Sequence, residues 1–234
     1  MLLGLRMIDD RYTITIDGPA GSGKSTAARL LAERLGILYL NSGAIYRAVT
    51  YIAIREGIDP ADGQAVLRLL GQGDIAVESS DAGVVVTVGG SDVTAELGST
   101  RVTEQVYKVA DNPVVREAVG KLAREIVGDL SFVAEGRDQG TVVFPEAEVK
   151  FYLDAALDER ARRRHADLVA SGEDVSLSEV ASALAERDRR DMSRPVGTLK
   201  KAEDAIYVDD SELDIEQTVE LLRREALRTL GTEG

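Results

Sequence analysis

Apolar runs of strand length alternate with segments of helical periodicity over most of the 234 residues. This alternation is typical of a parallel sheet covered by helices, because each parallel strand needs a long crossover connection. The predicted strands are 12–17, 37–41, 132–134, 149–154 and 205–208. The predicted helices are 24–35, 44–56, 114–127, 158–171, 177–191 and 215–230. The sequence therefore predicts an open α/β core with five strands.

The alternation of strand and helix patterns is interrupted in 57–106, where glycines flank a β-branched run at 84–88. The glycines are Gly71, Gly73, Gly83, Gly89 and Gly90. Because glycine-rich turns between β-branched runs are hairpin signals, we expect an inserted β-containing subdomain. We expect an N-terminal extension at 1–11 and a core made of three segments, 12–56, 107–154 and 196–234. The insert at 57–106 and a lid with arginine-rich helices at 155–195 separate these core segments.

Residues 18–25 read Gly-Pro-Ala-Gly-Ser-Gly-Lys-Ser and match the phosphate-binding pattern G-x-x-x-x-G-K-[ST] at every fixed position. The motif lies between a predicted strand and a predicted helix, which is the context that it requires. Its backbone N–H groups and the helix N-terminus are suited to bind phosphate oxygens. We expect Lys24 to reach the β- and γ-phosphates and the Ser25 hydroxyl to ligate Mg²⁺.

Composition narrows the possible partners. The net charge is −13, from 28 basic and 41 acidic residues, which argues against binding to a nucleic-acid polymer. The chain has no cysteine, which fits a reducing cytoplasm and excludes disulfides. No apolar run approaches the roughly 18 residues of a membrane span, and 1–11 lacks signal-peptide character. We expect a cytoplasmic monomer that holds a small anionic ligand.

Two charged segments follow predicted strands. Residues 41–47 place Ser42 at a helix start with Arg47 one turn later, so they suit an anion, although Ser42 alone is often a plain helix cap. Residues 135–138 (Glu-Gly-Arg-Asp) lie at the carboxyl end of a strand, where open α/β sheets bind ligands. Arg137 could grip a phosphate, or form an internal ion pair with Glu135 or Asp138.

Arginines are also concentrated in 160–164 and 187–194, on two predicted helices. In an acidic chain this concentration favours a mobile cover over a polyphosphate, although a solvated helix face with internal ion pairs has the same pattern. The single histidine, His165, lies among these arginines, and we interpret it as a packing or solubility residue.

Four segments in this order resemble the bacterial cytidylate kinase family: 17–25, 42–47 (Ser-Gly-Ala-Ile-Tyr-Arg), 135–145 (Glu-Gly-Arg-Asp-Gln-Gly-Thr-Val-Val-Phe-Pro) and 187–191 (Arg-Asp-Arg-Arg-Asp). The resemblance runs from about Ile14 to the C-terminal helix. It implies a P-loop kinase fold, with a five-stranded parallel sheet flanked by helices, a monophosphate-binding insert and a helical lid. It also implies a nucleoside monophosphate kinase reaction, in which ATP and CMP or dCMP give ADP and CDP or dCDP.

The resemblance assigns roles to individual positions. The ATP-binding set is Gly18, Pro19, Ala20, Gly21, Ser22, Gly23, Lys24, Ser25, Thr26 and Arg164, with Ser25 as the Mg²⁺ ligand. The acceptor-binding set is Ser42, Tyr46, Arg47, Tyr107, Arg116, Arg137, Asp138, Arg187, Asp191 and Arg194. The catalytic set is Lys24, Arg137, Arg160, Arg163 and Arg194. These groups would hold two polyanions in line and neutralise the transferring phosphoryl group.

The sequence departs from the family pattern in two places. Tyr107 stands where the family usually has a serine that contacts cytosine, and Leu97-Gly98-Ser99 replaces the usual Ile-Arg-Thr. Base recognition could therefore use the Tyr107 hydroxyl, Ser99 or Thr103. The alternatives are a kinase for another acceptor, such as UMP, and a non-catalytic nucleotide switch. The sequence lacks the guanine-reading Asn/Thr-Lys-x-Asp segment and the Leu-Ser-Gly-Gly-Gln signature that such switches and transporter ATPases carry.

Overall fold

The computed structural model describes residues 11–71, 75–80 and 83–231. Its centre is a five-stranded parallel sheet in the order β2-β6-β1-β7-β8. The strands are β1 Thr13–Asp17, β2 Leu38–Asn41, β6 Phe132–Gly136, β7 Val149–Asp154 and β8 Ile206–Asp209. All four pairings within this sheet are parallel, so the predicted fold class is confirmed.

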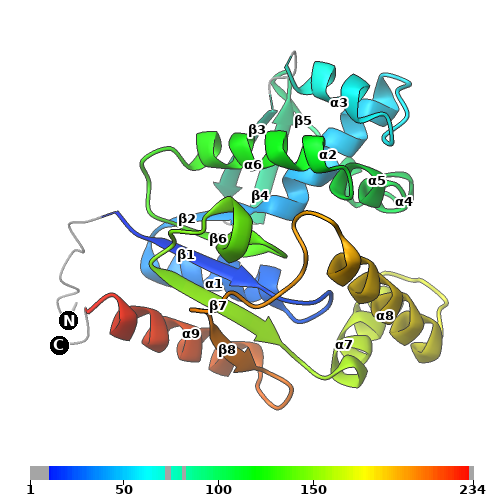
Figure 1. Cartoon of the computed structure of the whole chain (residues 1–234). Coiled ribbons are helices and arrows are strands. Elements are labelled where there is room, and N and C mark those ends of the chain that lie inside the picture. The colour runs from blue at the N-terminus through cyan, green and yellow to red at the C-terminus, as the bar shows by residue number, and fades with distance from the viewer. Residues whose placement is uncertain (1–10, 72–74, 81–82, 232–234) are drawn as a thin grey trace.

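Helices cover both faces of the sheet (Figure 1). The larger ones are α1 Lys24–Leu35, α2 Ser42–Arg55, α6 Pro113–Val127, α7 Leu157–Ala170, α8 Leu177–Ser193 and α9 Ile215–Thr229. Side chains of β6 alternate between the faces: Phe132 packs in the cluster with α2 and α6, and Val133 packs in the cluster with α1 and α9. Phe132 is fully buried, and burying such a side chain contributes about 1.5–3 kcal/mol.

The segment between α2 and α6, where the sequence predicts a β-containing insert, contains a second sheet in the order β3-β4-β5. Its antiparallel strands are β3 Ile75–Ser80, β4 Gly83–Val88 and β5 Ser91–Asp92. It also contains α3 Gly63–Leu70, the 3-10 turn Glu96–Gly98 and α4 Thr100–Thr103, and α5 Val106–Ala110 follows. The sequence did not predict these short helices. Part of the predicted glycine turn at 71–73, and residues 1–10 of the predicted extension, lie outside the described residues.

Most predicted element bounds differ from the structure by one or two residues. The strand β6 is two residues longer than predicted, and this difference affects the site. It extends through Glu135 and Gly136 because these residues pair with Ile16 and Asp17 of β1. A short π-helix, Gln139–Val143, follows and was not predicted. None of the helices in the described part of the chain has the length and apolar character that a membrane crossing requires.

The helices α7 and α8 pack against each other beside the carboxyl ends of β1 and β7 (Figure 1). A capping box starts α8, in which Ser176 and Glu179 bind each other's backbone N–H groups. The strands β3 and β4 of the insert contact β2 instead, and β4 also contacts α2. This arrangement leaves the carboxyl edge of the sheet between two lobes.

Candidate functional site

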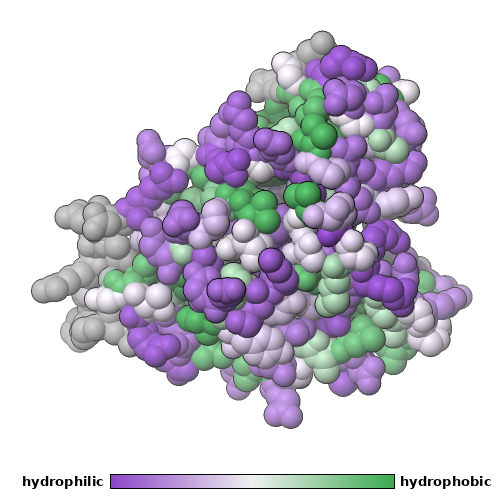
Figure 2. Space-filling view, viewed as in Figure 1, coloured by the Kyte–Doolittle hydropathy of each residue, from purple (hydrophilic) through white to green (hydrophobic). Residues whose placement is uncertain are grey.

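A cleft of about 1360 Å³ lies at the carboxyl edge of the sheet, between the insert and α7–α8. Figure 2 shows the surface indented between these two lobes, with hydrophilic residues on both sides. The phosphate loop, the start of α2, the end of β6 and the arginine-bearing helix faces all line it. The structure therefore brings together segments that are far apart in the sequence.

The phosphate loop is held tightly against the sheet. A Cβ on Gly18 would collide with the Leu153 carbonyl oxygen of β7, so only glycine fits there. Gly23 has a φ of 74° and precedes the first residue of α1. The positive φ turns the chain so that the N-terminus of α1 faces the cleft.

Lys24 lies at the floor of the cleft and is 4% exposed. Its Nζ donates to the Pro19 carbonyl oxygen at 2.5 Å and to the Ser22 hydroxyl at 3.2 Å. Burial and the neighbouring Arg137 lower the pKa of Lys24 to about 7. An anion bound at this point would restore the full charge of the ammonium group.

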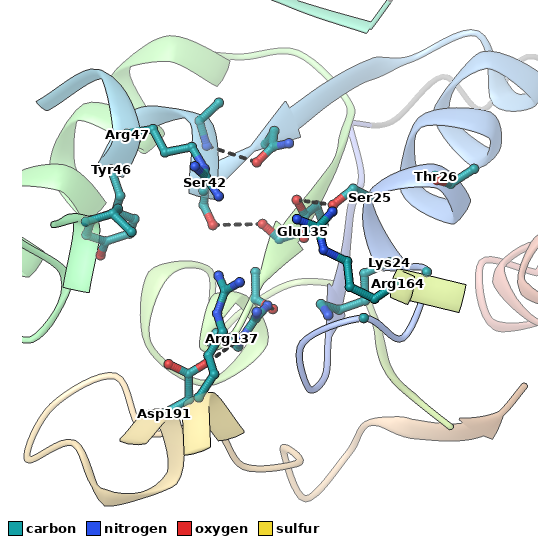
Figure 3. Close-up of a pocket in the computed structure, with 18 of the residues that line it drawn as sticks. Lys24, Ser25, Thr26, Ser42, Tyr46, Arg47, Glu135, Arg137, Arg164 and Asp191 are labelled. Atoms are coloured by element: carbon teal, nitrogen blue, oxygen red, sulfur yellow. Dashed lines mark hydrogen bonds and ion pairs between the residues drawn. The ribbon is translucent and has the colours of Figure 1, made fainter. Parts of the chain in front are cut away.

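A serine–carboxylate pair lies beside Lys24. The Ser25 hydroxyl donates to Glu135 Oε1 at 2.9 Å, and the Ser42 hydroxyl donates to the Glu135 carbonyl oxygen at 2.8 Å (Figure 3). Ser42 is not the helix cap: the Asn41 side chain accepts the N–H of Ala44 at 3.0 Å and caps α2. Glu135 thus joins the phosphate loop to the start of α2.

The Ser25–Glu135 pair fits Mg²⁺, which is bound by hard oxygen ligands, often one or two carboxylates together with substrate phosphates. No cluster of three metal-binding side chains occurs within the described residues, so the protein alone offers only part of a coordination shell. A nucleotide would have to supply the other oxygens.

Arg137 and Arg194 share one carboxylate, Asp191. Arg137 Nε donates to Asp191 Oδ2 at 2.8 Å, and Arg194 Nη2 lies 2.6 Å from Asp191 Oδ1. Arg194 also donates to Asp111 at 2.5 Å. Although burial acts in the opposite direction, Arg137 and Arg194 lower the pKa of Asp191. The internal ion pair predicted as an alternative for Arg137 exists, but its partner is Asp191 and not Glu135 or Asp138.

Asp138 pairs with Arg116 instead. Arg116 Nη2 donates to Asp138 at 2.5 Å, and Nη1 donates to the Ala110 carbonyl oxygen at 2.7 Å. The guanidinium carbon lies 5.2 Å from the centre of the Tyr46 ring, a cation–π contact. Gly197 packs so closely on this guanidinium that a Cβ there would collide with it. Arg116, Asp138 and Tyr46 therefore form a fixed wall of the cleft.

Three further arginines line the cleft: Arg47 is hydrogen-bonded to the protein, whereas Arg164 and Arg187 are not, as far as the described residues extend. Arg47 donates to the Leu97 carbonyl oxygen at 3.1 Å and to the Thr103 hydroxyl at 2.8 Å. Arg164 and Arg187 line the cleft, and within the described residues neither has a hydrogen bond or ion pair. Arg187 has an exposed side chain, but desolvation within the cleft and the nearby Arg137 lower its pKa to about 10. Crowded cations without counter-ions indicate an anion site.

Arg163 and Arg160 are bound by the protein itself. Arg163 lines the cleft and donates to Glu159 at 2.9 Å, to Asp210 Oδ1 at 3.0 Å and to the Asp210 carbonyl oxygen at 2.8 Å. Arg160 is 7% exposed and is absent from the cleft lining. The sequence analysis did not predict Asp210; its only signal is its position directly after the last strand.

Tyr107 projects from α5 toward α8. It is 38% exposed and lines the cleft. The guanidinium carbon of Arg190 lies over the Tyr107 ring, 4.7 Å from the ring centre. Leu97, Gly98 and Thr103, from the same predicted base-recognition region, line the cleft beside it, whereas Ser99 is not in the lining. The contact with Arg190 joins the insert side of the cleft to α8.

Asp17, which the sequence analysis did not select, connects the two strands that carry the site. Its carboxylate accepts the N–H groups of Gln139 and Gly140, each at 2.8 Å. Burial raises the pKa of Asp17 to about 7, although the two hydrogen bonds act in the opposite direction. The residue before the phosphate loop thereby fixes the turn that follows Arg137 and Asp138.

A phosphate loop at the carboxyl edge of a parallel sheet, facing a cleft lined by guanidinium groups, defines a P-loop phosphotransferase. The family model for cytidylate kinase matches residues 14–227. The chain belongs to the cytidylate kinase family and is a nucleoside monophosphate kinase.

Similar proteins cover nearly the whole chain. The cytidylate kinase of Carboxydothermus hydrogenoformans is 46% identical over 206 residues, which is 88% of this chain and 93% of the relative. The cytidylate kinase of a Geobacillus species is 45% identical over 207 residues, covering 88% and 92%. The crystal structure of an uncharacterized protein from Eubacterium ventriosum aligns with a TM-score of 0.52 and 12% identity, covering 92% and 98%. At that identity the structural match supports the fold alone.

Proposed function

We propose that this protein transfers the γ-phosphoryl group of ATP to CMP or dCMP, giving ADP and CDP or dCDP. The proposal rests on one observation: Lys24 of the phosphate loop lines the same cleft as two neighbouring arginines, Arg137 and Arg187. Phosphoryl transfer between two nucleotides requires such a meeting point, because two polyanions must approach each other in line.

The donor half consists of the phosphate loop and the start of α1. The loop N–H groups and the dipole of α1 would bind the triphosphate, with Lys24 at the β- and γ-phosphates. Thr26 and Arg164 lie at the edge of the same half (Figure 3). We assign Arg163 to the donor side as well, since it lines the cleft beside Gly23.

Ser25 and Glu135 would hold Mg²⁺ together with the phosphate oxygens of ATP. The bound cation would neutralise charge on the transferring group. The hydrogen bond between Ser25 and Glu135 already places two oxygens 2.9 Å apart at the mouth of the phosphate loop. Glu135 is thus an additional candidate ligand beside the predicted Ser25.

The acceptor half is built from guanidinium groups. We assign Arg47, Arg137 and Arg187 to the acceptor phosphate, because all three line the same cleft and both Arg137 and Arg47 lie close enough to Arg187 to lower its pKa. Asp191 and Arg194 lie next to them and suit a sugar hydroxyl. Ser42, Tyr46, Arg116 and Asp138 shape the wall behind them.

The reaction needs no general base from the protein. The attacking atom is an oxygen of the acceptor phosphate, which is largely ionised at neutral pH because its second pKa is about 6. The charges of Lys24, Arg137 and Arg187 would stabilise the charge that spreads over the transferring phosphoryl group. Because one chain supplies both halves of the cleft, we infer that a monomer is active, and the absence of cysteine fits a cytoplasmic location.

An ADP-release assay with MgATP tests the proposal. CMP, dCMP, UMP, AMP and GMP are offered at equal concentration, and CMP and dCMP are expected to give the highest turnover. Preference for another monophosphate, such as UMP, would support the same transfer mechanism with a different acceptor. This second candidate function is raised by Tyr107, which lines the cleft beside Arg190. Absence of turnover with all five would contradict the proposed reaction.

A further inference from the structure

One ion pair binds both polar backbone groups of Ala20 in the phosphate loop. Asp188 Oδ1 accepts the Ala20 N–H at 3.0 Å, and Arg160 Nη1 donates to the Ala20 carbonyl oxygen at 2.9 Å. The same Arg160 Nη1 donates to Asp188 Oδ2 at 2.6 Å. The peptide at the tip of the loop is therefore closed in a ring of hydrogen bonds with α7 and α8.

This ring is buried. Arg160 and Asp188 are each 7% exposed and Ala20 is 2% exposed. Arg160 Nε also donates to the Ala155 carbonyl oxygen at 2.9 Å, so the guanidinium plane is fixed on two sides. A buried hydrogen bond to a charged group is stronger than a neutral one, and removing one partner leaves the other charge without compensation.

Apolar packing adds to the polar contacts. Ala20 belongs to a small cluster with Ala161, Val180 and Leu184, which come from α7 and α8. A Cβ on Gly21 would lie 3.4 Å from Arg160 Cβ and 3.5 Å from Leu184 Cδ1. The tip of the phosphate loop is thus part of the core that holds the helix pair together, and the base of the predicted lid is attached to it.

We propose that Arg160 and Asp188 are positioning residues for the phosphate loop: they orient the Ala20 peptide so that the N–H groups at 21–24 face the donor phosphates. The affinity for the donor nucleotide is then set from α7 and α8 by two side chains that do not touch it. Arg163, one turn further along α7, lines the cleft, whereas Arg160 does not. The inference rests on the proposed donor site and goes beyond it by giving Arg160 an indirect role.

Equilibrium binding of MgATP and of CMP, measured separately for each variant, tests the proposal without requiring turnover. Asp188→Asn keeps the shape of the side chain but weakens both of its hydrogen bonds. We expect the Kd for MgATP to rise about tenfold and the Kd for CMP to change less than about twofold. Glu186→Gln is the matched control, because Glu186 is exposed on the same helix and pairs only with Arg189 in the described structure.

A double variant separates positioning from stability. Arg160→Met with Asp188→Leu replaces the buried ion pair by apolar side chains, which restores stability in many proteins. We expect its Tm to exceed that of Asp188→Asn while the Kd for MgATP stays about tenfold above the wild-type value. Wild-type MgATP affinity in a folded double variant would overturn the proposal.

Arg160→Lys keeps the test valid if the double variant does not fold. Lysine retains the charge beside Asp188, but its single ammonium group cannot bind Asp188, Ala20 and Ala155 in the planar geometry of a guanidinium group. We expect a several-fold weaker MgATP affinity with CMP affinity unchanged. Equal losses for both nucleotides, or no loss for either, would contradict a specific role at the phosphate loop. Failure of the proposed reaction would instead show as absent turnover in the wild-type protein.

Discussion

The two proposed halves of the cleft differ in the groups that they offer to a negatively charged phosphate. The donor half presents backbone N–H groups, and its flanking cations Arg160 and Arg163 are already hydrogen-bonded to the protein. In the proposed acceptor half, Arg137 lies near enough to Arg187 to lower its pKa, and Asp191, which pairs with Arg137, offsets only part of this repulsion. The donor site is thus defined by a fixed backbone shape, whereas the acceptor site has excess positive charge that a bound anion would neutralise.

Lys24 is the buried donor-side cation that is not paired with a carboxylate in the described structure, so its removal should have the largest effect. Lys24→Ala is expected to lower kcat about 10³-fold, because the charge at the β- and γ-phosphates is lost in a buried site. Steady-state kinetics with MgATP and CMP measure this loss. Lys121→Ala, on the exposed face of α6, is the control and should leave kcat unchanged. A loss of less than about tenfold in Lys24→Ala would contradict the role.

Arg137→Ala tests the acceptor half. The variant should lose about 10²-fold in kcat while it still binds MgATP, because Arg137 lies outside the phosphate loop. Turnover and MgATP binding are measured on the same preparation, with Arg189→Ala as an exposed control on α8. Near-normal turnover would remove Arg137 from the transfer site.

The pKa of Lys24 gives the donor half a pH dependence. With a pKa of about 7 in the nucleotide-free cleft, Lys24 is charged below pH 7 and loses its charge as the pH rises. Binding of the triphosphate favours the charged form, so the Kd for MgATP should rise about tenfold between pH 7 and pH 9. Arginine does not titrate in this range, so Lys24→Arg should show a flatter profile. A pH-independent Kd in the wild-type protein would contradict the shifted pKa.

Tyr107 is expected to have the smallest effect, since its ring is partly exposed and contacts only the edge of the acceptor half. A cation–π contact at an exposed site is worth about 0.5–1 kcal/mol, so Tyr107→Ser should raise the KM for CMP about two- to fivefold. Tyr107→Phe keeps the ring over Arg190 and should match the wild type. If Tyr107→Phe and Tyr107→Ser lose equally, the hydroxyl and not the ring is the functional group.

The donor half could be predicted from the sequence better than the acceptor half. The phosphate loop is a continuous motif whose conformation follows from its glycines, and the flanking strand and helix have clear periodicity. The partner of Arg137 lies 54 residues away in the sequence, so the neighbouring Glu135 and Asp138 were the wrong candidates, and the pairing of Arg116 with Asp138, 22 residues away, was not predicted. The π-helix after Asp138 was also missed, because the two N–H groups that start it are held by Asp17, far away in the sequence.

The structure divides the predicted site residues into those that line the cleft and those that lie behind it. Lys24, Ser25, Arg47 and Arg187 line the cleft, and Arg160 lies behind it. No residue pattern distinguishes Arg160 from Arg163 or Arg164, because all three lie within one and a half turns of the same helix. Only the packing of α7 on the phosphate loop separates them.

The hydrophobic cluster on the α2–α6 face has a consequence for folding. It runs from Leu40 and Phe132 in the central sheet to Val66, Val86 and Leu97 in the insert without a break. The insert therefore lacks a separate core, and it should melt together with the sheet in one cooperative transition. Excising it would uncover the apolar face of α2, so sequence length can vary freely only at its outer turns.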